Sequence, residues 1–293
     1  MSEESVSRQA HTRSGGAPER LGSGYRDLRV TVVDGWATLT LARPEQRNAM
    51  SPRMLAELPV ATAFLADQAS IAGLVITGAG ESFSVGGDLT TMHAELNDSE
   101  VDLTATSRMR IEYLHRAILN IRRMPFPVVA AVNGLAAGSG FGLALACDDR
   151  IASPGATFKA AYGAVGLTPD AGLTYLLPRI VGEARARVMI LGDEAVRARP
   201  AERLGLVSQV VEEPELLQAA LRRLKRLTRW SPQSIAATKH LLRNAWQDGL
   251  EDHLQCERDL FAEACATEDF RGAMEAFHAG GQPRFRRDQR HPC

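Results

Sequence analysis

The chain is poor in aromatic residues and in lysine, has almost no net charge and has no long apolar run. Aromatic residues make up 5% of its 293 residues, and 34 basic residues balance 35 acidic ones. We therefore expect neither a basic surface nor an aromatic platform for base stacking, which argues against nucleic-acid binding. No apolar run approaches the roughly 20 residues of a membrane-spanning helix, so we expect no membrane span.

Cysteine is also scarce, with four residues at positions 147, 256, 265 and 293. They form no CxxC pair and have no zinc-ligand spacing with histidine, so no metal site is expected. Cys256 and Cys265 lie nine residues apart in a helical pattern and point in different directions, which makes them a poor disulfide pair. Free thiols, and no secretory signal in the first 24 residues, predict a cytoplasmic protein.

The composition along the chain predicts three parts. Residues 1–24 are rich in Ser, Gly, Arg and Glu and are expected to form a disordered tail. Residues 25–212 are expected to form an α/β core and residues 213–293 a helical C-terminal region. In that region four helices are predicted, at Glu215–Arg229, Pro232–Trp246, Leu250–Ala266 and Phe270–Ala279.

Short strands dominate the predicted core. Asp34-Gly35 lies between two runs of alternating hydrophobicity, which predicts a hairpin because both turn residues tolerate positive φ. Two short, continuously apolar segments follow, at Ile71–Thr77 and Val128–Val132, and Arg150–Ala152 is predicted as a third buried strand. Strands buried on both faces and alternating with helices predict an α/β architecture with sites at the strand ends.

Two glycine-rich turns follow strands of this core. They span residues 80–89 and 133–142, and the second leads into a helical segment. Such turns can leave backbone N–H groups unpaired and aimed outward. If two of these N–H groups converge, they form an oxyanion hole for a carbonyl oxygen that gains negative charge. For either turn alone we favour an ordinary tight turn, and only the pair in its sequence context favours the oxyanion hole.

These turns occur among further ordered segments, and together they resemble the crotonase, or enoyl-CoA hydratase/isomerase, superfamily from Leu28 to Phe285. The segments are 41–44, 48–50, 83–89, 131–148, 166–172, 178–182 and 205–207. The resemblance implies a spiral of ββα units with a C-terminal trimerisation region, assembled as homotrimers or hexamers. It also implies a coenzyme A thioester as substrate, with no metal and no permanently bound cofactor.

Carried over by position, the resemblance assigns the oxyanion-hole N–H groups to Gly87 and Ser139. Because only three of the basic residues are lysines, Arg47 and Arg284 are candidates for contacts with the coenzyme A phosphates. Tyr162 would serve as a hydroxyl donor or, as we prefer, as an aromatic wall of the acyl pocket. The substrate or coenzyme A would contact Arg43, Arg47, Phe83, Val85, Gly86, Asp88, Leu89, Gly138 and Tyr162.

The reaction expected from the resemblance is a shift of a double bond. The two glutamates of the family's hydratases would fall at Gly142 and Tyr162 and are therefore absent, whereas Asp170 resembles the catalytic aspartate of isomerases. One carboxylate suffices for a Δ3-Δ2-enoyl-CoA isomerase, because it removes one proton and returns it elsewhere. Asp170 could instead cap a helix. Two alternatives stay open: a hydratase or lyase with other acid/base residues, and a degenerate protein that only binds the thioester.

Overall fold

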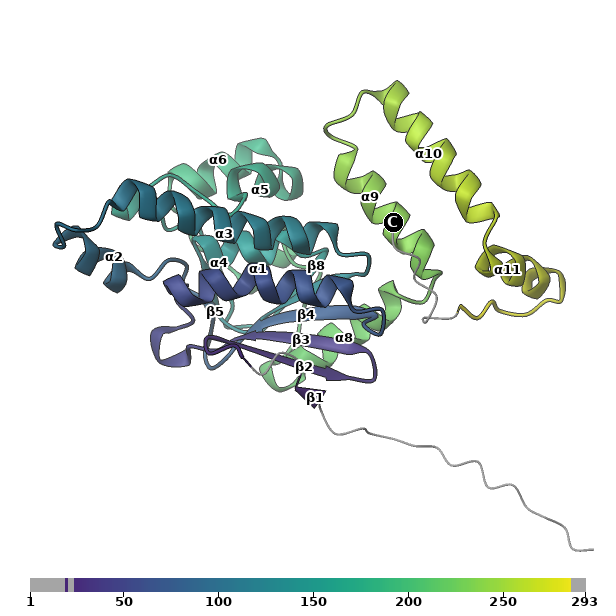
Figure 1. Cartoon of the computed structure of the whole chain (residues 1–293), viewed down its shortest axis with the longest axis horizontal. Helices are drawn as coiled ribbons and strands as arrows, with labels where there is room; N and C mark the ends of the chain where they lie inside the picture. Colours follow the sequence, from purple (N-terminus) through teal and green to yellow (C-terminus); the bar gives the residue numbers. More distant parts are fainter. Residues whose placement is uncertain (1–18, 21–23, 286–293) are drawn as a thin grey trace, which may run out of the picture.

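The protein, described here by a computed structural model for residues 19–20 and 24–285, contains two β-sheets wrapped by helices (Figure 1). The larger sheet consists, in spatial order, of β1 (Glu19–Arg20), β2 (Leu28–Val33), β3 (Trp36–Leu41), β4 (Gly73–Gly78), β6 (Val128–Val132), β8 (Asp149–Ala152) and β11 (Gln209–Val210). The smaller sheet consists of β10 (Val196–Arg197), β9 (Thr157–Lys159), β7 (Leu135–Ala137) and β5 (Ser82–Ser84).

The helices connect and cover these sheets. They are α1 (Pro52–Asp67), α2 (Leu89–Leu96), α3 (Leu103–Arg123), α4 (Ser139–Ala146), α5 (Leu173–Val181), α6 (Glu183–Leu191), α7 (Ala198–Arg203), α8 (Leu216–Leu227), α9 (Pro232–Asn244), α10 (Leu250–Cys265) and α11 (Glu268–His278). Short 3-10 helices occur at Pro44–Gln46, Gly163–Val165 and Glu213–Glu215. The four predicted C-terminal helices are confirmed as α8 to α11, with ends that differ by one or two residues.

The backbone of the core follows a spiral. Each turn contributes one strand to the larger sheet and the next strand to the smaller one: β4 and β5, then β6 and β7, then β8 and β9. Within each sheet these strands run parallel. The predicted crotonase-like spiral of ββα units is therefore confirmed.

The predicted hairpin opens this spiral. Strands β2 and β3 pair antiparallel, with Val33 opposite Trp36, so that Asp34 and Gly35 form a two-residue turn. Both turn residues have positive φ, at 50° and 78°. This left-handed conformation is what Asp-Gly allows and what matches the twist of the two strands.

Strand β1 differs from the prediction. Glu19 and Arg20 pair with Val32 and Thr31 of β2, although the sequence placed them in a disordered tail. The remainder of that predicted tail up to residue 23 lies outside the described residues.

Both faces of the larger sheet are covered, which explains its continuously apolar strands. One face packs on α1 and α3, with Leu39, Leu74 and Ile76 fully buried. The opposite face packs on α8 through Val75, Val129 and other buried side chains. Helix α8 thus belongs to the core, contrary to the predicted boundary at 212. The helices beyond it, α9 to α11, lie beside the body (Figure 1).

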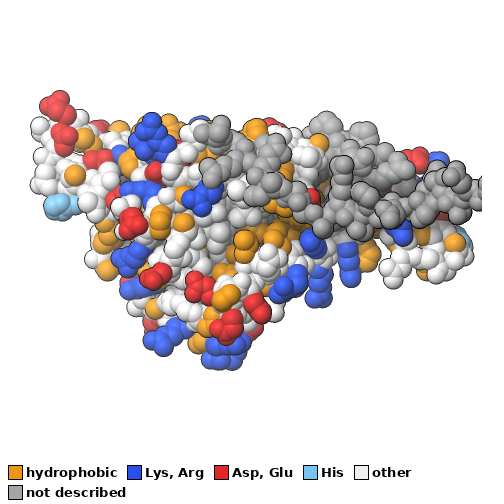
Figure 2. All heavy atoms as spheres, turned by 90° about the horizontal axis from the view of Figure 1, so that it is seen from below, with side chains coloured by type: hydrophobic (Ala, Val, Ile, Leu, Met, Phe, Trp, Pro, Cys, Tyr) orange, Lys and Arg blue, Asp and Glu red, His pale blue; other side chains and the backbone are white. Residues whose placement is uncertain are grey.

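Charge of both signs is distributed over the surface. Figure 2 shows basic and acidic side chains mixed over the coloured part of one face. Among the described residues, no helix combines the length and the apolar character that a membrane crossing requires. The mixed charges agree with the balanced charge of the sequence.

Candidate active site

Two backbone amides at the ends of β-strands form the centre of the site. They belong to Gly87 and Ser139, and each follows a glycine with positive φ: Gly86 at 88° and Gly138 at 53°. A Cβ atom on Gly86 would lie 3.2 Å from the Ser139 nitrogen and 2.9 Å from the Ala137 oxygen, so the two turns touch. Only glycine fits this close approach with this backbone conformation.

Both amides lie in turns whose backbone hydrogen bonds leave them out, within the part of the chain that the structure describes. Among the described residues, the N–H groups of Gly87 and Ser139 donate no hydrogen bond to a backbone carbonyl in a turn or loop. Ser139 is also the first residue of α4, where backbone N–H groups have no helical partner and the helix dipole favours negative charge. Both residues line the same cavity, so their N–H groups lie beside the space that a ligand would occupy.

A carboxylate lies beside this pair. The Ser139 hydroxyl is 2.8 Å from Oδ1 and 3.0 Å from Oδ2 of Asp170, and the Tyr162 hydroxyl is 2.5 Å from Oδ1. Burial, and then the negative charge of Asp170, raise the pKa of Tyr162 well above its usual value, so this hydroxyl is a neutral donor. Because Oδ1 accepts the closer bond from each hydroxyl, Oδ2 is the less engaged oxygen.

The Asp170 carboxylate does not cap the helix that follows. Helix α5 begins at Leu173, and its N-terminal capping residue Gly172 has φ 72° with no side-chain hydrogen bond. It is the main-chain oxygen of Asp170, and not its carboxylate, that accepts the Leu173 N–H. The carboxylate is thus directed to Ser139 and Tyr162 instead of to α5.

These groups line one cavity of about 930 Å³. Eight of the predicted site residues are in its lining: Val85, Gly87, Asp88, Leu89, Gly138, Ser139, Tyr162 and Asp170. Asp88, the other lining carboxylate, is already engaged. Its carboxylate accepts the Thr91 N–H at the start of α2 and lies 2.9 Å from Nη1 of Arg43. Although burial opposes it, these two contacts lower the pKa of Asp88.

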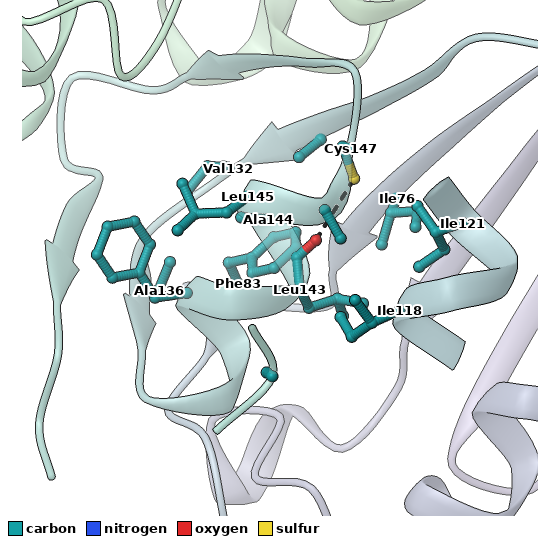
Figure 3. Packing of buried hydrophobic residues seen from close by; sticks show 14 of the residues in the cluster. Ile76, Phe83, Ile118, Ile121, Val132, Ala136, Leu143, Ala144, Leu145 and Cys147 are labelled. Carbon is teal, nitrogen blue, oxygen red and sulfur yellow. Dashed lines mark hydrogen bonds between the residues drawn. The ribbon is translucent and has the colours of Figure 1, made fainter. Parts of the chain in front are cut away.

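Four of the predicted contact residues do not line this cavity. Phe83 is fully buried in the core, where it packs beside Leu143 and Ala144 (Figure 3). Arg43 bonds to the Ala49 carbonyl and to Asp88 inside the protein. Arg47 is exposed at the end of a 3-10 helix, and Gly86 contributes its backbone to the turn. Arg284, the second phosphate candidate, is likewise absent from the cavity lining.

The two positions of the missing glutamates are occupied in different ways. Tyr162 supplies the hydroxyl that bonds to Asp170. At Gly142 a side chain has no space, because a Cβ atom there would lie 2.4 Å from the Cβ of Ala171. The segment that carries Asp170 thus fills the volume that a side chain at position 142 would need.

Sequence reasoning missed most of the cavity wall formed by α3. The lining residues recur along one face of this helix: Ser107, Arg110, Ile111, His115, Ile118, Leu119, Arg122 and Arg123. Their spacing of three or four residues is the signal that could have found this wall. Arg110 forms a bidentate ion pair with Glu95 of α2, at 2.7 and 2.5 Å. Its Nε is the buried side-chain atom without a hydrogen-bond partner among the described residues.

Helix α9 and the residues after it complete the cavity with Arg243, Asn244 and Gln247. The Gln247 amide donates a hydrogen bond of 3.1 Å to the Tyr175 hydroxyl of α5. No local pattern in the sequence indicates that these segments, about 70 residues apart, meet. This is why the sequence did not reveal this end of the cavity.

Three further side chains carry groups that take part in catalysis elsewhere: the thiol of Cys147 and the imidazoles of His93 and His115. Burial raises the pKa of the Cys147 thiol to about 12, and its sulfur bonds to the Leu143 carbonyl (Figure 3). His93 is absent from the cavity lining, whereas His115 is part of it. Within the described ranges, no three His, Cys, Asp or Glu residues gather as a metal-binding group.

Known proteins share this architecture. The family model for Enoyl-CoA hydratase/isomerase matches residues 32–288. A Rhodobacter capsulatus protein named "Probable enoyl-CoA hydratase" is 37% identical over 89% of this chain and 98% of its own length. The 1,2-epoxyphenylacetyl-CoA isomerase of Escherichia coli is 34% identical over 87% of this chain and 96% of its own.

A solved structure of an enoyl-CoA hydratase has the same fold. The crystal structure of an enoyl-CoA hydratase from Polaromonas sp. JS666 superposes with a TM-score of 0.82, at 35% identity, over 88% of this chain and 99% of that one. The sequence match extends over the two glycine-rich turns and the segment of Asp170. This chain therefore belongs to the enoyl-CoA hydratase/isomerase family.

Proposed function

We propose that the protein is a Δ3-Δ2-enoyl-CoA isomerase with Asp170 as its catalytic base and with Gly87 and Ser139 as its oxyanion hole. One observation carries this proposal. Of the two carboxylates that line the cavity, Asp88 is engaged by Arg43 and the start of α2, whereas Asp170 accepts hydrogen bonds from the neutral hydroxyls of Ser139 and Tyr162. A single available carboxylate suits a reaction that moves one proton.

The chemistry follows from this placement. The thioester oxygen of a 3-enoyl substrate accepts the N–H groups of Gly87 and Ser139, which makes the protons on C2 more acidic. Asp170 removes one of these protons, and the electron pair delocalises into a dienolate. The protonated Asp170 then returns the proton to C4, and this step moves the double bond from C3–C4 to C2–C3. No water is consumed, and base and acid are the same group.

The thioester portion of the substrate is proposed to be coenzyme A. The family to which the chain belongs and the names of both relatives support this choice. Because the proposed reaction is a proton transfer, it requires no permanently bound cofactor and no metal. The 930 Å³ cavity is within the range of sites that enclose ligands of drug size.

The test is Asp170→Asn, assayed for isomerisation of a 3-enoyl-CoA and for hydration of a 2-enoyl-CoA. Loss of a general base usually costs about 10²- to 10⁴-fold, and we expect a loss of this size in kcat for isomerisation. Asp34→Asn is the matched control, because Asp34 is an exposed turn residue whose positive φ asparagine also accepts.

Three outcomes would contradict the proposal. Undiminished isomerisation by Asp170→Asn would remove this carboxylate from the mechanism. Faster hydration than isomerisation by the wild type would favour a hydratase that uses other acid/base groups. Tight thioester binding without turnover would favour a protein that only binds its ligand.

A further inference from the structure

Three arginines without an acidic partner meet at one end of the cavity. Arg122 and Arg123 form the last turn of α3, Arg243 comes from α9, and all three line the cavity that contains Asp170. Among the described residues, none of the three forms an ion pair, and Arg243 bonds instead to a ring nitrogen of His240 at 3.0 Å.

The arginines also affect one another. Burial, followed by the positive charges of Arg123 and Arg122, lowers the pKa of Arg243. Asp148, which lines a neighbouring pocket together with Arg122, is already held by the Lys239 ammonium and the Val128 N–H. Among the described residues, no carboxylate is thus paired with any of the three guanidinium groups to offset their mutual repulsion.

The attraction of cations to a helix C-terminus explains only part of this arrangement. Arg122 and Arg123 lie in the last turn of α3, where the helix dipole favours positive charge. Arg243 lies on a different helix, is half-buried and faces the same cavity. Guanidinium groups that converge on a cavity from two helices have the geometry with which proteins bind carboxylates and phosphates.

We propose that Arg122, Arg123 and Arg243 bind an anionic group of the thioester ligand, away from its reacting carbons. This inference rests on the proposed thioester ligand but not on the type of reaction. The anion has two possible sources in such a ligand: a carboxylate at the far end of the acyl chain, or a phosphate of coenzyme A. The lining face of α3 from Ser107 to Arg123 is about 24 Å long, so the cavity extends well beyond one reacting centre.

The experiment combines four non-reacting ligands with three proteins, and a fourth protein tests the role of charge. The ligands are hexanoyl-CoA, adipyl-CoA, hexanoyl-pantetheine and adipyl-pantetheine, which vary the acyl carboxylate and the coenzyme A phosphates independently. The proteins are the wild type, Arg243→Gln and the matched control Arg116→Gln. Arg116 lies on α3, the helix of Arg122 and Arg123, is exposed, pairs with Glu112 and does not line the cavity. Calorimetry gives each Kd, and an Arg243→Lys variant tests whether charge alone restores binding.

The pattern of losses identifies the anion. A hydrogen bond to a charged group contributes about 10- to 100-fold, so we expect Arg243→Gln to reduce affinity selectively by about this factor. A loss confined to the adipyl ligands assigns the site to an acyl carboxylate. A loss confined to the coenzyme A ligands assigns it to a phosphate. Equal affinities of Arg243→Gln and Arg116→Gln for all four ligands would overturn the proposal.

Failure of this proposal is distinguishable from failure of the proposed reaction. Turnover of a 3-enoyl-CoA by the wild type, together with no effect of Arg243→Gln on binding, would leave the isomerase standing and exclude the anion site. If the wild type binds the ligands selectively but does not turn over a 3-enoyl-CoA, the anion site stands and the isomerase is excluded. Thermal unfolding of each variant in the absence of ligand shows whether a loss of affinity reflects a loss of folding.

Discussion

The substitution Gly142→Ala tests whether the segment that carries Asp170 fills the volume that a side chain at position 142 would need. Gly142 lies in α4, directly under Ala171, which adjoins Asp170 in the chain. A methyl group at position 142 would lie 2.4 Å from the Cβ of Ala171 and 2.8 Å from its carbonyl oxygen. Carbon atoms pack at about 3.5 to 4.0 Å, so the Ala171 segment must move by about 1 Å or more.

This displacement should affect both stability and catalysis. Overpacking a filled core costs about 1 to 3 kcal/mol, which we expect as a decrease in the free energy of unfolding. A misplacement of about 1 Å near a catalytic group can cost about 100-fold, so kcat for isomerisation should fall by this order. Denaturant unfolding and steady-state kinetics on a 3-enoyl-CoA measure the two effects separately.

A second substitution provides the control. Ala171→Gly removes the closer of the two clashing atoms, and glycine accepts the positive φ of 50° at this position. The double variant Gly142→Ala/Ala171→Gly should therefore recover part of both losses. Wild-type kcat and stability in Gly142→Ala, or a double variant no better than the single one, would refute the reasoning.

Three further predictions concern the hydroxyl pair, the buried thiol and the C-terminal helices. Tyr162→Phe removes one donor to Asp170, so kcat should fall about 10- to 100-fold with KM nearly unchanged; steady-state kinetics with unchanged kcat would contradict this. Cys147 should resist thiol reagents in the native state at pH 8, because its pKa of about 12 leaves the thiol neutral. If mass spectrometry shows that Cys147 is modified before Cys256, the prediction is wrong. The chain should form homotrimers or hexamers through α9 to α11, because Trp246 and Phe261 in this region are each 73% exposed. Light scattering should show that Phe261→Glu weakens this assembly. A monomeric wild type would disprove the prediction.

Local patterns were sufficient to predict the opening hairpin, the buried strand β6 and the four C-terminal helices. The Asp34-Gly35 turn follows from backbone stereochemistry at two residues, and strand β6 begins and ends at the predicted residues because a continuously apolar run needs burial on both faces. The same local logic failed for Phe83. Its neighbours in the glycine-rich turn line the cavity, but strand β5 directs this ring into the core.

The sequence by itself determined which groups are available for chemistry: a carboxylate at position 170, a tyrosine at 162, small residues at 142 and 138, and a chain nearly without lysine. Only the tertiary structure decided which of these groups meet. Ser139 and Asp170 are 31 residues apart, and Arg123 and Arg243 lie on different helices, so no periodicity relates them. Their proximity arises when buried strands and helices stack in three dimensions, because burial of apolar surface fixes the path of the backbone between distant segments.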